Sequence, residues 1–218
     1  MRLLFVAMLI LSTSFSQAST ITLNYSVFFG YMKTMYKLDY AYVTTAFYLV
    51  DNTDKSLCTI KSAQMVMENV HEPILFEPEG RLLPFYSDQH RKDGALLEVE
   101  LADQRALSNC DLQITVMAKE SELFDLNEQK LASISEQLEG VLKKNAGMIG
   151  KYFLPTFAGV RLHLSNTLNQ SQIAMLGDGV STASNGDLLL SKESFALINK
   201  INKLQLAVVR ITPWMLNN

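Results

Sequence analysis

The chain has 218 residues, 48% of them hydrophobic and 19% charged, which is the composition of a folded globular protein and disfavours extended disorder. It carries 22 acidic and 19 basic side chains, and its formal net charge is −3. A general nucleic-acid binder needs a basic surface, so this balance argues against nucleic acid as a partner.

The first eighteen residues predict a secretory signal peptide. Arg2 supplies a positive charge, Leu3–Leu11 form an apolar run, and Ser16 and Ala18 are small residues placed for a cleavage site. A membrane-spanning helix needs about 20 apolar residues, so this run is too short to cross a bilayer. We expect residues 1–18 to be removed and the remaining protein, without a transmembrane segment, to be periplasmic or secreted.

The two cysteines, Cys58 and Cys110, predict one disulfide, since an even pair in an oxidising compartment most simply forms a bridge. Catalytic dithiols usually lie in a Cys-x-x-Cys motif, which these two do not form. Each cysteine begins a strand-like run. We expect the bridge to join two strand starts at one end of a sheet, between strands that are not hairpin partners.

The first half of the chain predicts a helix followed by strands. Apolar residues in Asn24–Lys37 recur at helical spacing, with Asn24 as the N-cap. The segment Val70–Tyr86 holds three of the five prolines, which indicates a loop or an edge strand. Strands are predicted from alternation and turn signals at Tyr42–Val50, Cys58–Met67, Gly94–Leu101 and Asp111–Ala118.

The second half begins with the most regular helical pattern of the chain. Asp125 is the predicted N-cap, with Glu128 completing a capping box, and Gly147 is the predicted C-cap. The elements predicted after it are a strand at Val160–Ser165, a hairpin turn at Asn185-Gly186, a short helix within Ser191–Lys203, and a strand at Leu204–Thr212 that Pro213 stops.

Few helices interspersed among many strands favour an α+β fold. We expect antiparallel sheet or sandwich elements, one long amphipathic helix and a shorter N-terminal helix. Residues 19–218 are predicted to form a single domain, and the region 120–150 is where it could divide in two.

Catalytic signatures are missing from the sequence. It has no H-E-x-x-H, G-x-S-x-G, P-loop or G-x-G-x-x-G motif. We therefore predict no catalytic residues, no metal ligands and no cofactor. His163 is predicted to point outward from its strand as an ordinary surface residue.

Two segments hold the candidate binding residues. Tyr86–Asp93 combines carboxylates, an imidazole and cations in one predicted loop, which a charged hairpin loop would also explain. Six of the eight tyrosines lie between Tyr25 and Tyr48, as in a recognition surface or in a helix packed on a sheet. The candidates are Tyr40, Tyr42, Tyr48, Tyr86, Asp88, His90 and Arg91.

Four segments resemble an uncharacterised family of exported gammaproteobacterial proteins, defined by a domain of unknown function. They are Tyr40–Val50, Cys58-Thr59-Ile60, Leu82–Leu101 and Val209–Trp214. The resemblance implies a periplasmic setting and supplies no activity or functional residue.

The sequence favours a non-catalytic binding or accessory module of the cell envelope, with another envelope protein or a peptide as its partner. One alternative is an envelope hydrolase or metal-dependent enzyme centred on the 86–93 loop, using Asp88, His90 and Asp93. The other is an assembly factor that offers an exposed sheet edge to a client strand.

Overall fold

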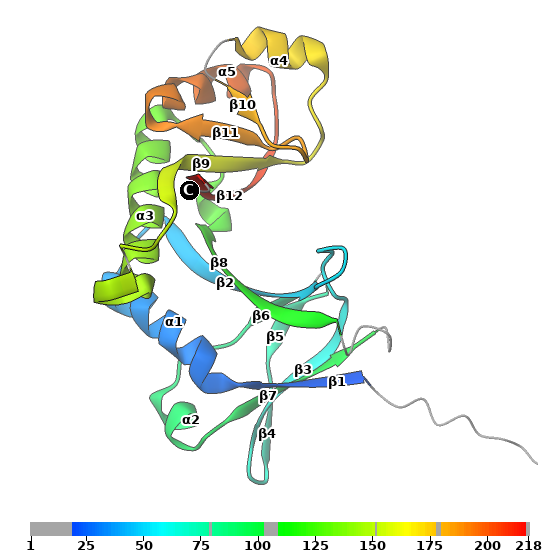
Figure 1. The fold of residues 1–218 in the computed structure, drawn as a ribbon. Helices are drawn as coiled ribbons and strands as arrows, with labels where there is room; N and C mark the ends of the chain where they lie inside the picture. Colours follow the sequence, from blue (N-terminus) through cyan, green and yellow to red (C-terminus); the bar gives the residue numbers. More distant parts are fainter. Residues whose placement is uncertain (1–18, 79, 103–108, 151, 178–179, 217–218) are drawn as a thin grey trace, which may run out of the picture.

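The computed structural model describes residues 19–216 except 79, 103–108, 151 and 178–179, so the predicted signal peptide lies outside the described residues. Within the described part, the strands form three four-stranded sheets, and every strand pair is antiparallel. Helices lie against these sheets (Figure 1). The predicted α+β class with antiparallel sheets is confirmed.

Two sheets come from the first half of the chain. Sheet A has the order β1 (Ser19–Asn24), β7 (Leu96–Leu101), β3 (Ile60–Met67), β4 (Val70–Pro73). Sheet B has the order β5 (Leu75–Glu77), β6 (Arg81–Leu83), β2 (Val43–Asp51), β8 (Cys110–Ala118).

A first hydrophobic core joins sheets A and B to α1 (Tyr25–Leu38). Phe28 of α1 is fully buried and lies 4.9 Å, ring to ring, from Phe47 of β2. Leu97 and Val99 of β7 are also fully buried, as the alternation of that strand predicts. The predicted N-cap of α1 is confirmed, because Asn24 Oδ1 accepts a hydrogen bond from the Ser26 N–H at 2.8 Å.

Sheet C comes from the last third of the chain. Its order is β10 (Ser181–Thr182), β11 (Leu188–Ser191), β9 (Thr156–Leu164), β12 (Val208–Leu216). The segments that connect its strands include α4 (Gln170–Leu176), a 3₁₀ helix (Lys192–Leu197) and α5 (Ile198–Lys203).

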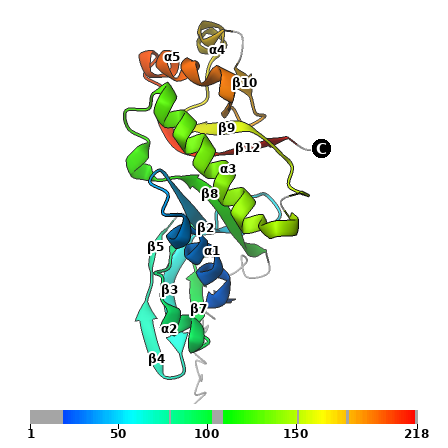
Figure 2. The same ribbon diagram turned by 90° about the vertical axis from the view of Figure 1, so that its left-hand side faces the viewer.

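The helix α3 (Glu128–Gly150) holds sheets B and C together. One face of it buries Leu131, Ile134 and Leu138 in a second core that includes Val116 of β8 and Leu162 of β9. Figure 2 shows α3 crossing both sheets on one side of the molecule. Because β12 also lies beside β8, the two sheets meet along these strands and open away from α3 (Figure 1).

The start of α3 corrects a prediction. Asn127, not Asp125, caps the helix: its Oδ1 accepts from the Lys130 N–H at 2.9 Å. Asp125 has φ 52° and turns the chain just before the helix. Gly147 interrupts the helix with φ 73°, which agrees with its predicted role as the end of the regular helix, and one more turn follows.

Two further predictions of local structure are wrong. Residues within 86–93 form a short helix, α2 (Asp88–Lys92), because Ser87 Oγ accepts from the His90 N–H and caps it. The last strand does not stop at Pro213, which lies within β12 opposite Val160. In sheet C, β12 pairs with β9 alone, and an edge strand tolerates the missing N–H of proline.

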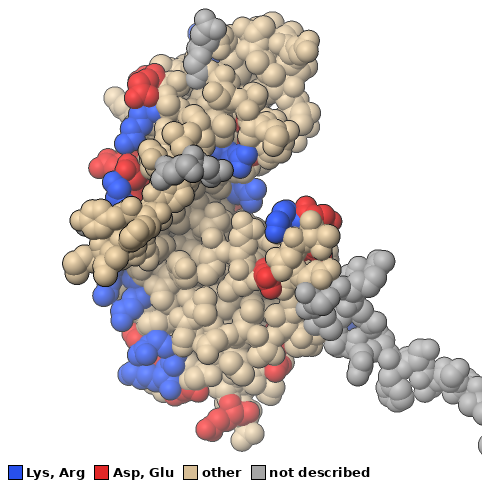
Figure 3. Space-filling view, viewed as in Figure 1, with Lys and Arg blue, Asp and Glu red and all other residues tan. Residues whose placement is uncertain are grey.

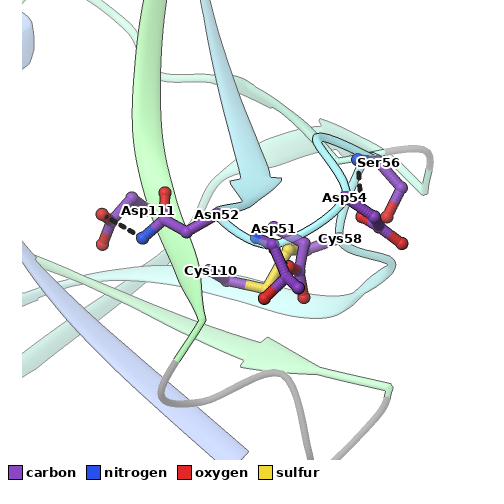
Figure 4. Close-up of a disulfide and its surroundings, with 8 residues drawn as sticks. Asp51, Asn52, Asp54, Ser56, Cys58, Cys110 and Asp111 are labelled. Carbon is purple, nitrogen blue, oxygen red and sulfur yellow. Dashed lines mark hydrogen bonds between the residues drawn. A yellow bond between two sulfur atoms is a disulfide. The ribbon is translucent and has the colours of Figure 1, made fainter.

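The predicted disulfide between Cys58 and Cys110 is present (Figure 4). Cys58 precedes β3 of sheet A and Cys110 begins β8 of sheet B, so the two cysteines do not belong to hairpin partners, as predicted. The bridge joins two different sheets rather than two strands of one sheet. Beside the bridge, Asn52 Nδ2 donates to Asp111 Oδ2 at 2.6 Å, and this hydrogen bond holds the turn after β2 against β8.

Candidate functional site

A cleft of about 770 Å³ lies between the outer faces of sheets B and C, and Leu142, Asn145 and Ala146 near the end of α3 also line it. This volume is within the range of small-molecule sites. The space-filling view shows the hollow between the two halves of the molecule, with basic side chains inside it (Figure 3).

Sheet C supplies the polar wall of the cleft through the two-residue alternation of its strands. Val160 and Leu162 of β9 and Ile211 of β12 are fully buried in the core around α3. The residues between them therefore face the other way. Arg161 lies opposite Thr212 and His163 lies opposite Arg210 in the strand register, and all four line the cleft.

Sheet B supplies the facing wall. Tyr48 and Val50 of β2 and Gln113 and Thr115 of β8 alternate with the residues that bury into the cores. The guanidinium carbon of Arg210 lies 5.8 Å from the centre of the Tyr48 ring, which is cation–π distance. This contact crosses from sheet C to sheet B and places a cation in the cleft.

A chain of polar contacts runs across the sheet C wall. Asp187 Oδ2 lies 2.9 Å from His163 Nδ1, and His163 Nε2 lies 2.9 Å from Thr212 Oγ1. Asn185 Nδ2 donates to the same Asp187 oxygen at 2.7 Å. Arg161 Nε lies 3.1 Å from it, an ion pair without hydrogen-bond geometry. Three side chains, those of His163, Asn185 and Arg161, therefore converge on one oxygen of the Asp187 carboxylate.

The environment of His163 lowers its pKa to about 4. Burial is the largest cause, and the nearby Arg210 and Arg161 add to it, while Asp187 acts in the opposite direction. The imidazole is therefore neutral at neutral pH, with Nδ1 facing the Asp187 carboxylate and Nε2 at hydrogen-bond distance from the Thr212 hydroxyl.

The cleft is basic although the chain as a whole is acidic. Its lining includes Lys55, Arg161 and Arg210, and none of the described residues that line it is Asp or Glu. Arg161 is neutralised by Asp187, which lies behind it. Arg210 has no carboxylate within ion-pair distance among the described residues, so its charge remains available to a ligand.

The tyrosine candidates do not form one surface. Tyr48 lines the cleft and is 8% exposed, with its hydroxyl 3.5 Å from Met117 Sδ. Tyr40 lies against α3 at Gly140, and the Tyr42 N–H donates to Gln137 Oε1 at 2.9 Å. Of these three, only Tyr48 faces the cleft; the other two hold α3 against β2.

The other candidates gather around α2, away from the cleft. Arg91 stacks over Phe29, 5.0 Å from its ring, and lies 3.8 Å from Asp88. Tyr86 stacks between Phe29 and the exposed Tyr36.

His90 is largely buried among the aromatic residues beside α2 and lies 3.5 Å from a carboxylate oxygen of Glu72. Among the described residues, which include Asp88, His90 and Asp93, no group of three or more His, Cys, Asp or Glu side chains could hold a metal ion.

Sequence reasoning did not select most of the residues of the cleft. Arg161, Asp187, Arg210 and Thr212 received no role, although alternation along Val160–Ser165 did place His163 on the outward face. The one usable signal was that Arg161 and His163 share that face. The sequence could not show that the outward face of sheet C lies opposite sheet B across a cleft.

The fold and the site together define an α+β protein with a basic cleft between two antiparallel sheets. The chain belongs to the family described as "Protein of unknown function (DUF2987)", which matches residues 17–164. This confirms the predicted membership of a family of unknown function. The matched region includes Arg161 and His163 and ends before Asp187, Arg210 and Thr212, as well as before the segment Val209–Trp214 used in the resemblance.

Comparison with curated proteins and with solved structures found no match. Among the described residues, no helix is both long and apolar enough to span a membrane.

Proposed function

We propose that this is an exported, non-catalytic binding module whose cleft takes an anionic ligand with an apolar part. The observation that carries the proposal is the charge of the cleft: three cations and no acidic side chain among its described lining residues, in a chain with net charge −3. A cleft lined by one sign of charge attracts ligands of the other sign.

The remaining lining residues support the apolar part of the ligand. Val50 and Leu57 on one side, and Leu142, Pro213 and Met215 on the other, give the cleft apolar walls beside the cations. Ligand sites typically combine mostly apolar walls with a few placed polar groups. A carboxylate, sulfate or phosphate head beside Arg210, with its apolar part along these walls, fits this arrangement.

Export of the protein is part of the proposal. It rests on the predicted signal peptide and on the Cys58–Cys110 bridge, which needs an oxidising compartment to persist. The alternative of an assembly factor has less support, because the edge strands β4, β5 and β10 are short and the long edge strands β8 and β12 lie beside each other.

The test uses two fluorescent probes of similar shape, anionic 8-anilinonaphthalene-1-sulfonate and neutral N-phenyl-1-naphthylamine, titrated into the purified protein. We expect Arg210→Gln to weaken the anionic probe about fivefold, corresponding to roughly 1 kcal/mol for a partly exposed charge contact, and to leave the neutral probe unchanged. Arg91→Gln is the control, since Arg91 is a surface arginine that contacts an aromatic ring outside the cleft. Equal weakening of both probes, or an equal effect of both variants, would contradict the proposal.

A second candidate function is favoured by the chain Asp187–His163–Thr212. A neutral imidazole with a hydroxyl beside one ring nitrogen and a carboxylate beside the other is the arrangement of a nucleophilic hydrolase. The Thr212 hydroxyl would attack an ester carbonyl, His163 Nε2 would take its proton and return it to the leaving alcohol, and water would then release the acid.

In this second candidate function the reaction takes place in the cleft, whereas the sequence had placed a possible hydrolase site in the 86–93 loop. A fluorophosphonate reagent followed by intact-mass measurement tests it: a single adduct that Thr212→Val abolishes would support hydrolysis. If the reagent does not label the protein, the hydrolase candidate is contradicted and the proposal of a binding site stands.

A further inference from the structure

The turn at the end of α3 exposes four large apolar side chains within six residues. The exposed fractions are 83% for Met148, 75% for Ile149, 78% for Tyr152 and 80% for Phe153. Large apolar residues scattered singly over a surface are ordinary, whereas a contiguous exposed group marks a contact surface. We call Met148, Ile149, Tyr152 and Phe153 the α3 tip.

The backbone keeps these side chains turned outward. Gly147, with φ 73°, breaks the regular helix, and the chain then closes tight turns in which the Phe153 N–H donates to the Gly150 oxygen at 2.9 Å. The tip projects from the side of the molecule on which α3 lies (Figures 1 and 2). It is a convex knob, so a protein partner would need a matching pocket, whereas a lipid bilayer receives such a knob without one.

Basic residues adjoin the tip along the chain. The sequence has no acidic residue between Glu139 and Asp178, while Lys143 and Lys144 lie in the helical turn just before Gly147. Lys143 pairs with Glu139, and Lys144 has no carboxylate partner among the described residues. Figure 3 shows the uncharged projection, with basic side chains and some acidic ones above and below it. In a chain of net charge −3, Lys144 therefore places a positive charge without a carboxylate partner, among the described residues, beside this apolar knob.

We infer that the α3 tip inserts into the surface of a bilayer rich in anionic phospholipid. Aromatic and aliphatic side chains that enter the headgroup region, bordered by lysines that contact the headgroups, are the features of a protein that lies on a membrane. The tip adjoins the basic cleft, because Asn145, Ala146 and Leu154 on either side of it line that cleft. A protein seated in this way would hold the cleft close to the membrane surface, but the inference does not depend on what the cleft binds.

The test is flotation of the purified protein with vesicles that contain phosphatidylglycerol, compared with vesicles of phosphatidylcholine alone. We expect binding to the anionic vesicles, weakened by raised salt because the lysine contacts are screened. The variant Ile149→Ser/Phe153→Ser should lose at least about tenfold in partitioning, since it removes the inserted apolar groups. Because these side chains are exposed, we expect both substitutions to leave the fold intact, and thermal unfolding of each variant checks this directly.

The matched control is Leu75→Ser/Phe124→Ser, which removes two apolar side chains that are 77% and 72% exposed elsewhere on the molecule. It should bind anionic vesicles as the unchanged protein does. The inference is overturned if the unchanged protein stays unbound, or if the two double variants behave alike. It is also overturned if sedimentation velocity finds a dimer that the tip variant abolishes while vesicle binding persists, because a second copy then covers the tip.

Discussion

Removing the disulfide should cost a large part of the stability of this protein. The bridge joins residues separated by 52 positions, and the chain-entropy relation for a loop of that length gives about 4 kcal/mol at 25 °C. Both half-cystines are 6% exposed and belong to the core between sheets A and B. Cys58→Ala/Cys110→Ala is the appropriate change, since serine would add the cost of two buried hydroxyls.

Urea unfolding followed by far-ultraviolet circular dichroism measures the loss. With a slope of about 2 kcal/mol per molar urea, a loss of 4 kcal/mol lowers the midpoint by about 2 M. The unchanged protein unfolded under reducing conditions should show the same loss, and the alanine variant should not respond to reductant. Fluorescence of Trp214, on β12 of sheet C, reports separately on the half of the molecule that the bridge does not touch.

The refuting outcome is a midpoint for the alanine variant within about 0.3 M of that of the unchanged protein, well below the shift that loop closure requires. An unchanged protein that behaves identically with and without reductant would refute the same reasoning, because its bridge would then contribute nothing to the unfolding equilibrium.

Two further predictions concern sheet C. The pKa of His163 is lowered in the folded protein to about 4, whereas the ordinary pKa of histidine is near 6.5. The neutral imidazole therefore contributes its full stabilisation above pH 6.5, and this stabilisation is lost as the pH falls from there towards 4. Because solvent reaches the cleft, we expect the contribution to be about 1–2 kcal/mol rather than the full linkage value. His163→Gln should therefore flatten the fall in melting temperature over that range, and an unaltered slope would contradict the assigned cause. Gly159→Ala should destabilise by at least about 2 kcal/mol, because its Cβ would lie 2.1 Å from the Leu190 carbonyl oxygen at φ 151°. Gly30→Ala on α1 is the control: its new Cβ would meet nothing within 4 Å, so this substitution should stabilise the protein slightly. Equal effects of the two substitutions on stability would count against the steric argument.

Local patterns predicted most of the elements correctly, because strand alternation and helix caps are short-range properties. Asn24 caps α1, Leu97 and Val99 point into the core, and Gly147 ends the regular part of α3, each as its neighbours in the sequence indicate. One error arose where two local signals competed. Asp125 and Asn127 are both capping residues, and the structure uses the one nearer the helix.

Pro213 shows a different kind of failure. Proline ends a strand only where its missing N–H is needed, and whether it is needed depends on the position of the strand in the sheet. In sheet C, β12 pairs with β9 alone, so the strand continues to Leu216. No property of residues 204–216 by themselves carries that information.

The sequence by itself determined the class of fold, the pairing of the two cysteines and the membership of a family of unknown function. Those properties follow from composition, residue spacing and similarity along the chain. Only the tertiary structure decided where the candidate site lies. Tyr48, His163 and Arg210 come from three strands in two sheets, and they meet because α3 binds the backs of both sheets and leaves their outer faces opposed.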